Sequence, residues 1–337
     1  MKALTLDVAV EKLRLAKPFR ISGFVFETQD AVIVTLGDGT HRGRGEASGV
    51  YYLDDNMKEM VAAIEAVRGQ IEKGIDRDML QRLLPPSGAR NALDCALWDL
   101  EAHRLGKSVW QLAELPAPPK PLITTFTLGA DDPAVMAEGA KHYAAARAIK
   151  MKLTGDLDLD IARVRAVRTA RPGTWLGVDA NQGYSIDVLD KLVAALVEQQ
   201  VSLVEQPLAR GREADLDDFD SPIPLAADES ALSLVDLPKL IGRFHVVNIK
   251  LDKCGGLTEA LKIAHAARGL GLKVMVGNMV GTSWAMAPAF VVGQLCDIVD
   301  LDGPIFLAKD RNPSIRYDDG YAWSGDDVWG SPLAAVT

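Results

Sequence analysis

Cysteine is scarce in this sequence, and the few cysteines are not arranged for cross-linking or for metal binding. Cys95, Cys254 and Cys296 lie far apart and form no Cys-x-x-Cys pair. A disulfide framework and a paired-cysteine zinc site are therefore not indicated. No apolar run reaches the roughly 18 residues of a membrane span, and the residues after Met1 lack the apolar core of a signal peptide. We therefore expect a cytoplasmic protein without a membrane partner.

Positive charge is also in the minority. The 337 residues include 37 Lys and Arg against 46 Asp and Glu, a formal net charge of −9, which argues against nucleic acid as a partner and favours small molecules. The hydrophobic content of 48% is ordinary for a globular protein. The length suits a barrel of about 200 to 250 residues plus a second, smaller domain.

Two segments approach common functional motifs without matching them. Residues 43–49 (GRGEASG) differ from the dinucleotide-binding fingerprint by one position and do not open a convincing helix. Residues 281–285 (GTSWA) resemble a nucleophile elbow only loosely, and no histidine follows a strand where it would serve as the base. We therefore discount both readings.

The sequence has instead a repeated pattern of strand and helix. Apolar runs that read as buried strands end at or just before charged residues, 22 to 27 positions apart: Lys152, Asp179, Glu205, Asp228 and Lys250. That interval is the length of one βα unit. Because the apolar residues are continuous and do not alternate with polar ones, both faces of each strand are expected to be buried, as in a parallel sheet covered by helices.

The charged residues at these strand ends predict a metal site. In a (β/α) barrel the C-terminal ends of the strands meet at one mouth, where active sites lie. Asp179, Glu205 and Asp228 would repel one another there without a cation, and oxygen ligands favour Mg²⁺, with Mn²⁺ as a substitute. Helix capping explains any one of them. It does not explain three carboxylates in succession followed by a lysine, because Ser or Thr would cap as readily.

Two further pairs have the spacing that places side chains on the same face of a strand. Lys150 and Lys152 are one pair; an exposed edge strand is the alternative, but the apolar neighbours favour a barrel strand. Asp300 and Asp302 are the other pair, after the last predicted strand. A turn or cap would explain them, whereas the functional interpretation is a clamp for a cationic group.

The rest of the chain predicts the second domain. Strands near 4–10 and 31–36 precede helices at 55–73 and 88–105, a pattern typical of an α+β domain, with a loop expected over residues 17–24. Barrel strands at 123–127, 273–277 and 296–299 bring the barrel total to eight. The predicted division is an α+β domain, a barrel, and a tail that returns to the first domain, at residues 1–118, 119–310 and 311–337.

At this point the motifs resemble a known family. Five segments resemble, in order and spacing, the muconate lactonising enzyme subgroup of the enolase superfamily: Lys150-Met151-Lys152, Val178-Asp179-Ala180-Asn181, Val204-Glu205-Gln206-Pro207, Ala227-Asp228-Glu229-Ser230 and Asn248-Ile249-Lys250-Leu251. The resemblance covers essentially the whole chain. Within it, Asp300-Leu301-Asp302-Gly303-Pro304 and residues 89–100 resemble dipeptide epimerases of the L-Ala-D/L-Glu type. Cycloisomerases and o-succinylbenzoate synthases of the subgroup are not expected to have the Asp-x-Asp element.

The resemblance implies an α/β fold, a (β/α)7β TIM-like barrel with an α+β capping domain built from the N-terminal region and the C-terminal tail. It implies an isomerase of cell wall peptide metabolism, cytoplasmic and compatible with a homo-oligomer. Lys152 and Lys250 would be the two bases of a 1,1-proton transfer through an enolate stabilised by one Mg²⁺ per subunit. Asp179, Glu205 and Asp228 would hold the metal. The dipeptide would contact seven residues: Lys150, Thr127, Asn278, Asp300, Asp302, Arg20 and Phe24.

The second residue of the dipeptide is the open point. Glutamate-specific epimerases are expected to offer an arginine from the capping loop, but residues 21–26 read ISGFVF and the nearby cation is Arg20. If Arg20 points inward, it pairs with the glutamate carboxylate; if not, Phe24 and Phe26 line an apolar pocket. A cycloisomerase or o-succinylbenzoate synthase is the alternative within the fold. A non-catalytic binding barrel is disfavoured, because buried lysines are costly without a task.

Overall fold

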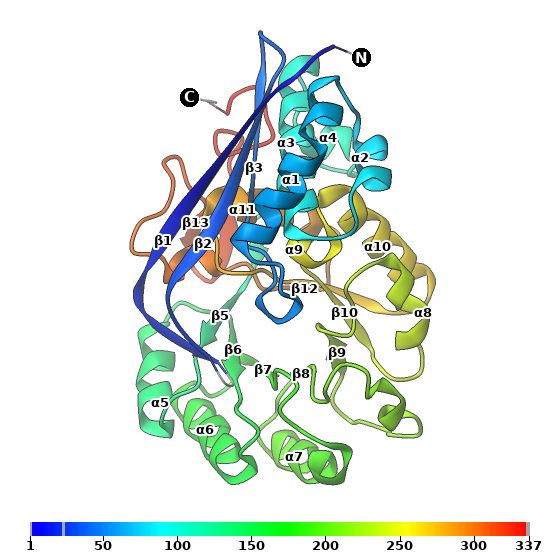
Figure 1. The fold of residues 1–337 in the computed structure, drawn as a ribbon. Helices are drawn as coiled ribbons and strands as arrows, with labels where there is room; N and C mark the ends of the chain where they lie inside the picture. Colours follow the sequence, from blue (N-terminus) through cyan, green and yellow to red (C-terminus); the bar gives the residue numbers. More distant parts are fainter. Residues whose placement is uncertain (1, 22–23, 335–337) are drawn as a thin grey trace.

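The computed structural model describes residues 2–21 and 24–334, with the side chains at 19–21 and 24 outside the described part. The fold has two parts (Figure 1). A three-stranded antiparallel sheet with its helices forms the capping domain at one end of the molecule, and a ring of parallel strands surrounded by helices forms the other. Among the described residues no helix is both long enough and apolar enough to cross a bilayer.

Eight parallel strands form the barrel, in sequential order around the ring. They are β5 (Thr125–Leu128), β6 (Ala148–Lys152), β7 (Trp175–Asp179), β8 (Leu203–Glu205), β9 (Leu225–Ala227), β10 (Val246–Ile249), β11 (Lys273–Val276) and β12 (Ile298–Val299). No backbone pairing joins β12 to β5 in the described chain. Side chains close this gap, because Thr127 N donates to Asp302 Oδ2 (2.6 Å) and Leu301 N to Thr124 Oγ1 (2.9 Å). The predicted TIM-like barrel of eight strands is confirmed.

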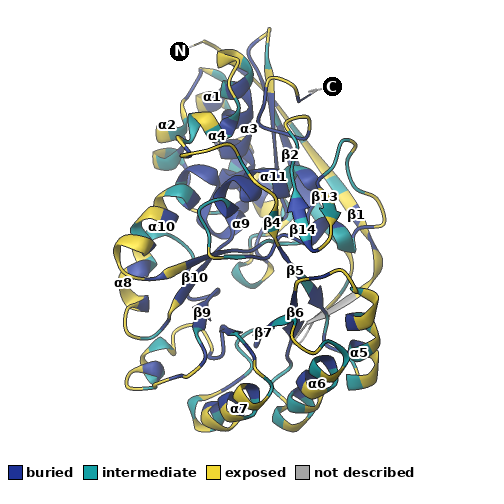
Figure 2. Ribbon diagram, turned by 180° about the vertical axis from the view of Figure 1, so that it is seen from behind, coloured by how far each residue is buried: buried dark blue, intermediate teal, exposed yellow. Residues whose placement is uncertain are grey.

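Helices cover the outside of the ring, and all of them except the last, Ser283–Gly293, which is mostly buried, have their outer faces in solvent (Figure 2). They are α5 (Pro133–His142), α6 (Leu157–Ala170), α7 (Ile186–Glu198), α8 (Leu237–Leu240), α10 (Leu257–Gly269) and α11 (Ser283–Gly293). Inside the ring a small apolar cluster includes Leu203, Ala226, Val246 and Met275. Two positions further along each of these strands lie Glu205, Asp228, Asn248 and Gly277. Since side chains two apart on a strand face the same way, the same inward rows are apolar at the bottom and mostly polar at the mouth.

The capping domain begins with a long hairpin. Strands β1 (Thr5–Ile21) and β2 (Phe24–Gly37) pair antiparallel, and β3 (Arg42–Ala47) extends the sheet. The expected loop at 17–24 is therefore wrong for the backbone described: pairing continues at Phe19↔Phe26, Arg20↔Val25 and Ile21↔Phe24, after an irregularity between Arg14 and Phe19. Cross-strand hydrogen bonds hold these residues extended although their sequence shows no alternation.

Helices α1 (Met57–Glu72), α2 (Arg77–Leu83), α3 (Gly88–Leu105) and α4 (Val109–Leu112) complete the capping domain. β3 packs so closely on α3 that a Cβ on Gly45 would lie 1.9 Å from the backbone oxygen of Ala92. Only glycine permits that approach. The apolar core of this domain lies between the sheet and α1 to α3.

The C-terminal tail first pairs beside the barrel. Strands β13 (Arg316–Asp318) and β14 (Tyr321–Trp323), joined by a turn at residues 319–320, extend β4 (Leu122–Ile123). The chain then returns to the capping domain, where Trp329 Nε1 donates to the Arg44 carbonyl (2.8 Å) and Gly330 N to Asp99 Oδ1 (2.8 Å). These contacts agree with a capping domain built from both ends of the chain. The boundaries at residues 118 and 310 stay predictions.

Candidate active site

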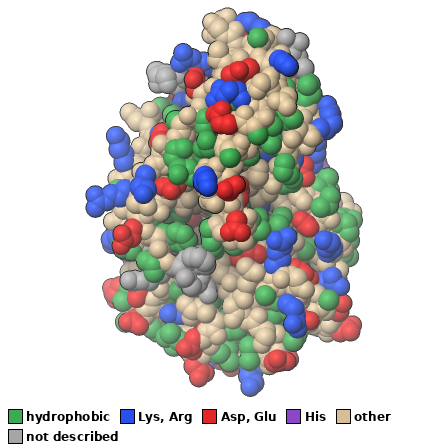
Figure 3. Space-filling view, viewed as in Figure 1, with side chains coloured by type: hydrophobic (Ala, Val, Ile, Leu, Met, Phe, Trp, Pro, Cys, Tyr) green, Lys and Arg blue, Asp and Glu red, His purple; other side chains and the backbone are tan. Residues whose placement is uncertain are grey.

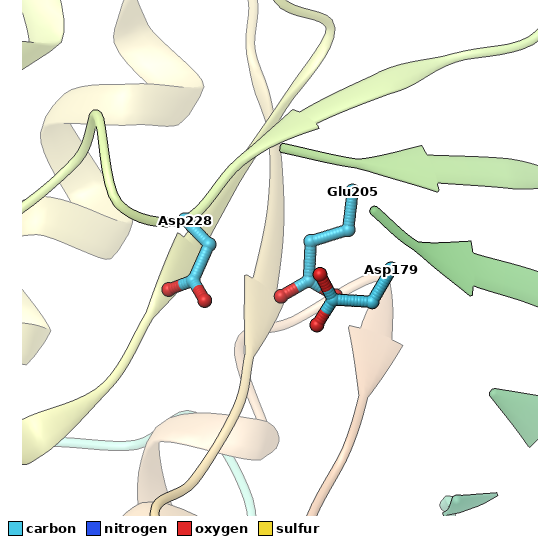
Figure 4. Close-up of side chains that lie close together, drawn as sticks. All are labelled: Asp179, Glu205 and Asp228. Carbon is cyan, nitrogen blue, oxygen red and sulfur yellow. The ribbon is translucent and has the colours of Figure 1, made fainter. Parts of the chain in front are cut away.

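Three carboxylates meet at the mouth of the barrel. Asp179 ends β7, Glu205 ends β8, and Asp228 follows β9, so the parallel register brings them to one level. One oxygen of each lies within 4.8 Å of the others, and all three side chains are buried. Figure 4 shows them converging from neighbouring strands. The predicted metal ligands are therefore brought together as a set.

Lysines surround this trio. Lys152 Nζ contacts Asp179 Oδ2 at 2.6 Å, and Lys250 Nζ contacts Asp228 Oδ2 at 2.6 Å. Lys150 points the same way as Lys152, as its spacing predicts, and lies 3.1 Å from Glu205 Oε2 and 2.5 Å from Asp300 Oδ2. Burial lowers the pKa of Lys250, but the carboxylates of Asp228, Glu205 and Asp179 outweigh it and hold this pKa above its ordinary value.

Lys152 and Lys250 lie on opposite sides of the carboxylates. They belong to the ends of β6 and β10, with β7, β8 and β9 between them. Both line one cavity of about 290 Å³ between the barrel mouth and the capping domain. The cavity also touches Asn181, Glu229 and Asn278 of the barrel. Its capping wall includes residues of the hairpin and of the segment before α1: Leu15, Phe26, Thr28, Gln29, Asp30, Tyr51, Tyr52 and Asp55.

The charges in this cluster do not balance. Among the described residues, the cluster formed by the trio, the lysines and their neighbours holds six buried carboxylates, those of Asp179, Glu205, Asp228, Glu229, Asp300 and Asp302, against four ammonium groups, those of Lys150, Lys152, Lys250 and Lys253. If all are ionised, six minus four leaves two negative charges, which one divalent cation would neutralise. An all-oxygen trio is a donor set that Mg²⁺ accepts. The residues present therefore fit a divalent cation.

The pKa values report the same excess of negative charge. Burial, followed by the charge of Asp179, raises the pKa of Glu205 to about 7. Burial together with Asp228 raises the pKa of Glu229 to about 8. Both carboxyls would ionise more readily with additional positive charge beside them.

Asp300 and Asp302 lie beside the lysines, after β12. Asp300 accepts hydrogen bonds from Lys150 and from Thr125 Oγ1, and Asn278 Nδ2 donates to its carbonyl. Asp302 accepts from the Thr127 backbone N. Burial, with the charge of Asp300, raises the pKa of Asp302 to about 7. The pair is thus placed beside the site, but Asp300 already has a cationic partner.

Sequence reasoning passed over several residues of this site. Asn248 Nδ2 donates to Glu205 Oε1 at 2.8 Å, and its position two before Lys250 puts both on the inward face. A Cβ on Gly277 would lie 2.7 Å from Asn248 Oδ1 and 3.0 Å from Lys250 Cε, so a side chain there would have to displace both groups. Lys253 and Tyr51 carried no strand-end signal. The side chains of Arg20 and Phe24 lie outside the described residues, so their predicted substrate contacts stay predictions.

Two buried carboxylates fix the capping domain over the mouth. Asp252, which follows Lys250 by two residues, accepts hydrogen bonds from Ser48 N (2.9 Å) and Gly49 N (3.0 Å). In the opposite direction Glu46 of β3 accepts from Thr282 N at 2.6 Å. These bonds join the segment that leads to Tyr51 directly to the loops after β10 and β11.

Comparison with known proteins agrees with this architecture. Residues 3–113 match the mandelate racemase / muconate lactonizing enzyme N-terminal domain, and residues 135–323 match the enolase C-terminal domain-like family. The L-Ala-D/L-Glu epimerase of Escherichia coli K12 is 38% identical over 94% of this chain and 98% of its own. The N-acetyl-D-glutamate racemase of a Pseudoalteromonas species is 38% identical over 86% of this chain and 91% of its own.

Solved structures are similar throughout their length. An enolase family member from Agrobacterium tumefaciens with homology to dipeptide epimerases, solved with sodium and L-Ala-L-Glu, has a TM-score of 0.93 and 39% identity, covering 97% of this chain and 100% of its own. A dipeptide epimerase from Methylococcus capsulatus, solved with Mg and L-Arg-D-Lys, has a TM-score of 0.88 and 31% identity, covering 96% and 97%. The chain therefore belongs to the mandelate racemase and muconate lactonizing enzyme family of the enolase superfamily.

Proposed function

We propose that this protein is a magnesium-dependent dipeptide epimerase that acts on L-Ala-D/L-Glu. One observation carries the proposal: two lysines, Lys152 and Lys250, line the same cavity from opposite sides of three metal-binding carboxylates. An epimerase must remove a proton from one face of a carbon atom and return one to the other face. Relatives named as dipeptide epimerases over nearly the whole chain support the choice of reaction.

Asp179, Glu205 and Asp228 would hold the cation, with Mn²⁺ as a substitute for Mg²⁺. When bound, the cation supplies positive charge that offsets the negative charge developing on the substrate carboxylate as the α-proton leaves. Lys150 adds a fixed positive charge on the same side, held by Glu205 and Asp300. Lys152 and Lys250 line the cavity and Lys150 does not, so we assign Lys150 to substrate binding through its charge rather than to proton transfer.

Lys152 and Lys250 perform the proton transfers. Each ammonium is held by a different carboxylate, Lys152 by Asp179 and Lys250 by Asp228. A substrate α-carbon between them would present one face to each lysine. The lysine that faces the α-hydrogen acts as a neutral amine and takes the proton, and the other lysine, in its ammonium form, donates its own proton to the opposite face, which inverts the centre.

The substrate's ammonium group would bind at Asp300 and Asp302. Because Asp300 already pairs with Lys150, we assign the larger share of this contact to Asp302, whose neighbours in the structure are the backbone and hydroxyl of Thr127 and the charge of Asp300. Thr127 positions the Asp302 carboxylate, and Asn278 holds the backbone carbonyl of Asp300. Arg20 and Phe24 remain the proposed contacts of the second side chain.

N-acetylglutamate racemisation is a second candidate, favoured by the 38% identical N-acetyl-D-glutamate racemase. An N-acetylated substrate carries no ammonium, so it would leave the Asp302 carboxylate without a cationic ligand. Buried carboxylates without a partner are costly, and we therefore rank this substrate second. The same α-proton chemistry would serve both substrates.

We also propose a location and a source of substrate. The reaction would take place in the cytoplasm and would act on peptides released from the cell wall. The protein would be a homo-oligomer or a monomer. On the face shown in Figure 3, acidic and basic side chains are interspersed. That distribution and the net charge of −9 support a small-molecule substrate over nucleic acid.

The test is α-proton exchange in deuterium oxide, across a panel of dipeptides and N-acetylated amino acids in the presence of Mg²⁺. We expect deuterium at the α-carbon of the second residue of L-Ala-L-Glu and L-Ala-D-Glu, with interconversion of the two, and much slower exchange with N-acetylglutamate. Exchange with N-acetylglutamate alone would select the second candidate. No exchange with any member of the panel would remove both.

A further inference from the structure

Lys253 is a buried lysine that the mechanism above does not use. It lies in the short helix α9 (Leu251–Cys254), three residues after Lys250, and its side chain has 0% exposed surface. Its ammonium donates three hydrogen bonds: to Asp228 Oδ1 (2.5 Å), to the Asp228 carbonyl (2.6 Å) and to the Asn248 carbonyl (2.9 Å). An ammonium group has three N–H donors, so all of them are engaged.

The two lysines that contact Asp228 differ in freedom. Lys250 makes a single hydrogen bond, to Oδ2, and lines the cavity. Lys253 bonds to the other oxygen, Oδ1, and is not among the residues that line the cavity. Two of its three partners are backbone carbonyls, which cannot turn away as a side chain does. Lys253 is therefore fixed in place, whereas Lys250 can leave Asp228 by rotation of its own side chain.

We propose that Lys253 is a positioning residue for the metal ligand Asp228. By holding Oδ1 and the backbone of Asp228, it leaves Oδ2 as the oxygen available to a cation bound together with Asp179 and Glu205. It also provides Asp228 with a permanent positive partner, so that Lys250 is released for proton transfer. The second role rests on the proposed function, whereas the positioning of Asp228 depends only on the contacts of this chain.

Residues that hydrogen-bond to a metal ligand hold it in the orientation that binds the metal. Loss of such a residue typically lowers metal affinity about 10- to 100-fold. Without Lys253, Oδ1 of Asp228 would be buried with no donor, and Lys250 would be the remaining ammonium on that carboxylate. A cation would then have to displace Lys250 from its position as the sole partner. Lys253→Met keeps the apolar volume of the stem and removes only the ammonium.

The experiment compares Mg²⁺ dissociation constants, measured by titration calorimetry without substrate, in the parent, Lys253→Met and Lys250→Met. Lys262→Met, on the exposed face of α10, is the control. We expect Lys253→Met to weaken Mg²⁺ binding about 10- to 100-fold. Lys250→Met should bind Mg²⁺ at least as tightly as the parent, because it no longer competes for Asp228 Oδ2, and the control should bind as the parent does. The proposal is wrong if the Lys253→Met variant binds Mg²⁺ as tightly as the parent does. It is also wrong if Lys250→Met weakens Mg²⁺ binding as much as Lys253→Met does, because the two lysines would then act alike.

Thermal unfolding separates positioning from a purely structural role. Lys253→Met should lose part of the stabilisation that Mg²⁺ adds to the parent, because ligand stabilisation falls with affinity. A purely structural role would lower the unfolding temperature equally with and without Mg²⁺ and would leave the dissociation constant unchanged.

A measurement on the parent protein covers the case in which Lys253→Met does not fold. Reductive methylation of lysines, read residue by residue by mass spectrometry, should increase at Lys250 when Mg²⁺ is added, since Mg²⁺ takes over Oδ2 of Asp228. Lys253 should stay unmodified with and without Mg²⁺. Methylation of Lys253, or a Lys250 rate that Mg²⁺ does not change, contradicts the proposal. None of these three measurements uses a substrate. A failed exchange assay would therefore reject the epimerase function and leave this inference standing.

Discussion

The barrel mouth and the β1–β2 hairpin face the same cavity but are built differently. At the mouth, Asp228 and Lys150 are almost completely buried, and each has several charged partners. On the hairpin, Phe26 is half-buried and Val25 is 58% exposed. The proposed reacting groups thus belong to the barrel, and the wall proposed to meet the second side chain of the substrate belongs to a peripheral strand pair. Changes at the mouth should stop the chemistry, and changes on the hairpin should redirect it.

Metal removal tests the mouth with the largest expected effect. Dialysis against a chelator should lower α-proton exchange by more than about 10³-fold, since loss of even one stabilising donor costs about 10² to 10³. Added Mg²⁺ should restore the rate, and Mn²⁺ should do so in part. The measurement is deuterium incorporation into L-Ala-L-Glu before and after reconstitution. Full activity in a preparation shown to be metal-free would refute the magnesium assignment.

The two lysines should divide the reaction by stereochemistry. Lys152→Ala should abolish exchange from one epimer of L-Ala-Glu while exchange from the other persists, and Lys250→Ala should show the reverse. A general base contributes about 10² to 10⁴ in rate, so each blocked exchange should fall by that factor. The measurement is deuterium incorporation from each pure epimer in each variant. If both variants lose the same epimer, the two-base assignment is wrong.

Much of the mouth could be predicted from the sequence because the pattern and the position coincide there. A buried parallel strand must end at the mouth, and the side-chain period of two fixes which residues face inward. Those two rules placed Asp179, Glu205 and the Lys150–Lys152 pair. The motif resemblance supplied the roles.

Other contacts could not be predicted from local pattern. Lys253 lies one helical turn past a strand, where a lysine is usually exposed, and only the tertiary structure shows that it returns to Asp228. The pairing of Lys150 with Asp300 joins residues 150 positions apart. On the hairpin, residues 17–21 have no alternation, and the expected loop was wrong because pairing with β2 decides the backbone.

The third prediction lies at the edge of the mouth. Asp302→Asn keeps an oxygen for the Thr127 backbone N–H but removes the negative charge that would hold the substrate ammonium. A charge-assisted hydrogen bond is worth about 1.5 to 3 kcal/mol, so KM for L-Ala-L-Glu should rise about 10- to 100-fold. For N-acetylated dipeptides, poor substrates of the parent, the change should be small. The measurement is kcat and KM for both. Equal turnover of free and N-acetylated dipeptides by the parent would remove the clamp.

The smallest expected effect on rate, and the clearest on selectivity, concerns the hairpin. The ratio of kcat/KM for L-Ala-L-Glu over L-Ala-L-Leu should favour glutamate in the parent. It should fall about tenfold or more in Arg20→Ala, because a guanidinium pairs with a carboxylate in a bidentate manner worth about 1.5 to 3 kcal/mol. Lys17→Ala, an exposed cation on the same strand, is the control and should keep the parent ratio. A parent that prefers L-Ala-L-Leu, with Arg20→Ala unchanged, would mean that Phe26 and its neighbours form an apolar pocket in which a glutamate carboxylate has no partner. That outcome would make the protein an epimerase of apolar dipeptides. The predictions for both lysines and for Asp302 would stand, since the groups that hold these three side chains, Asp179, Asp228 and Thr127, belong to the barrel.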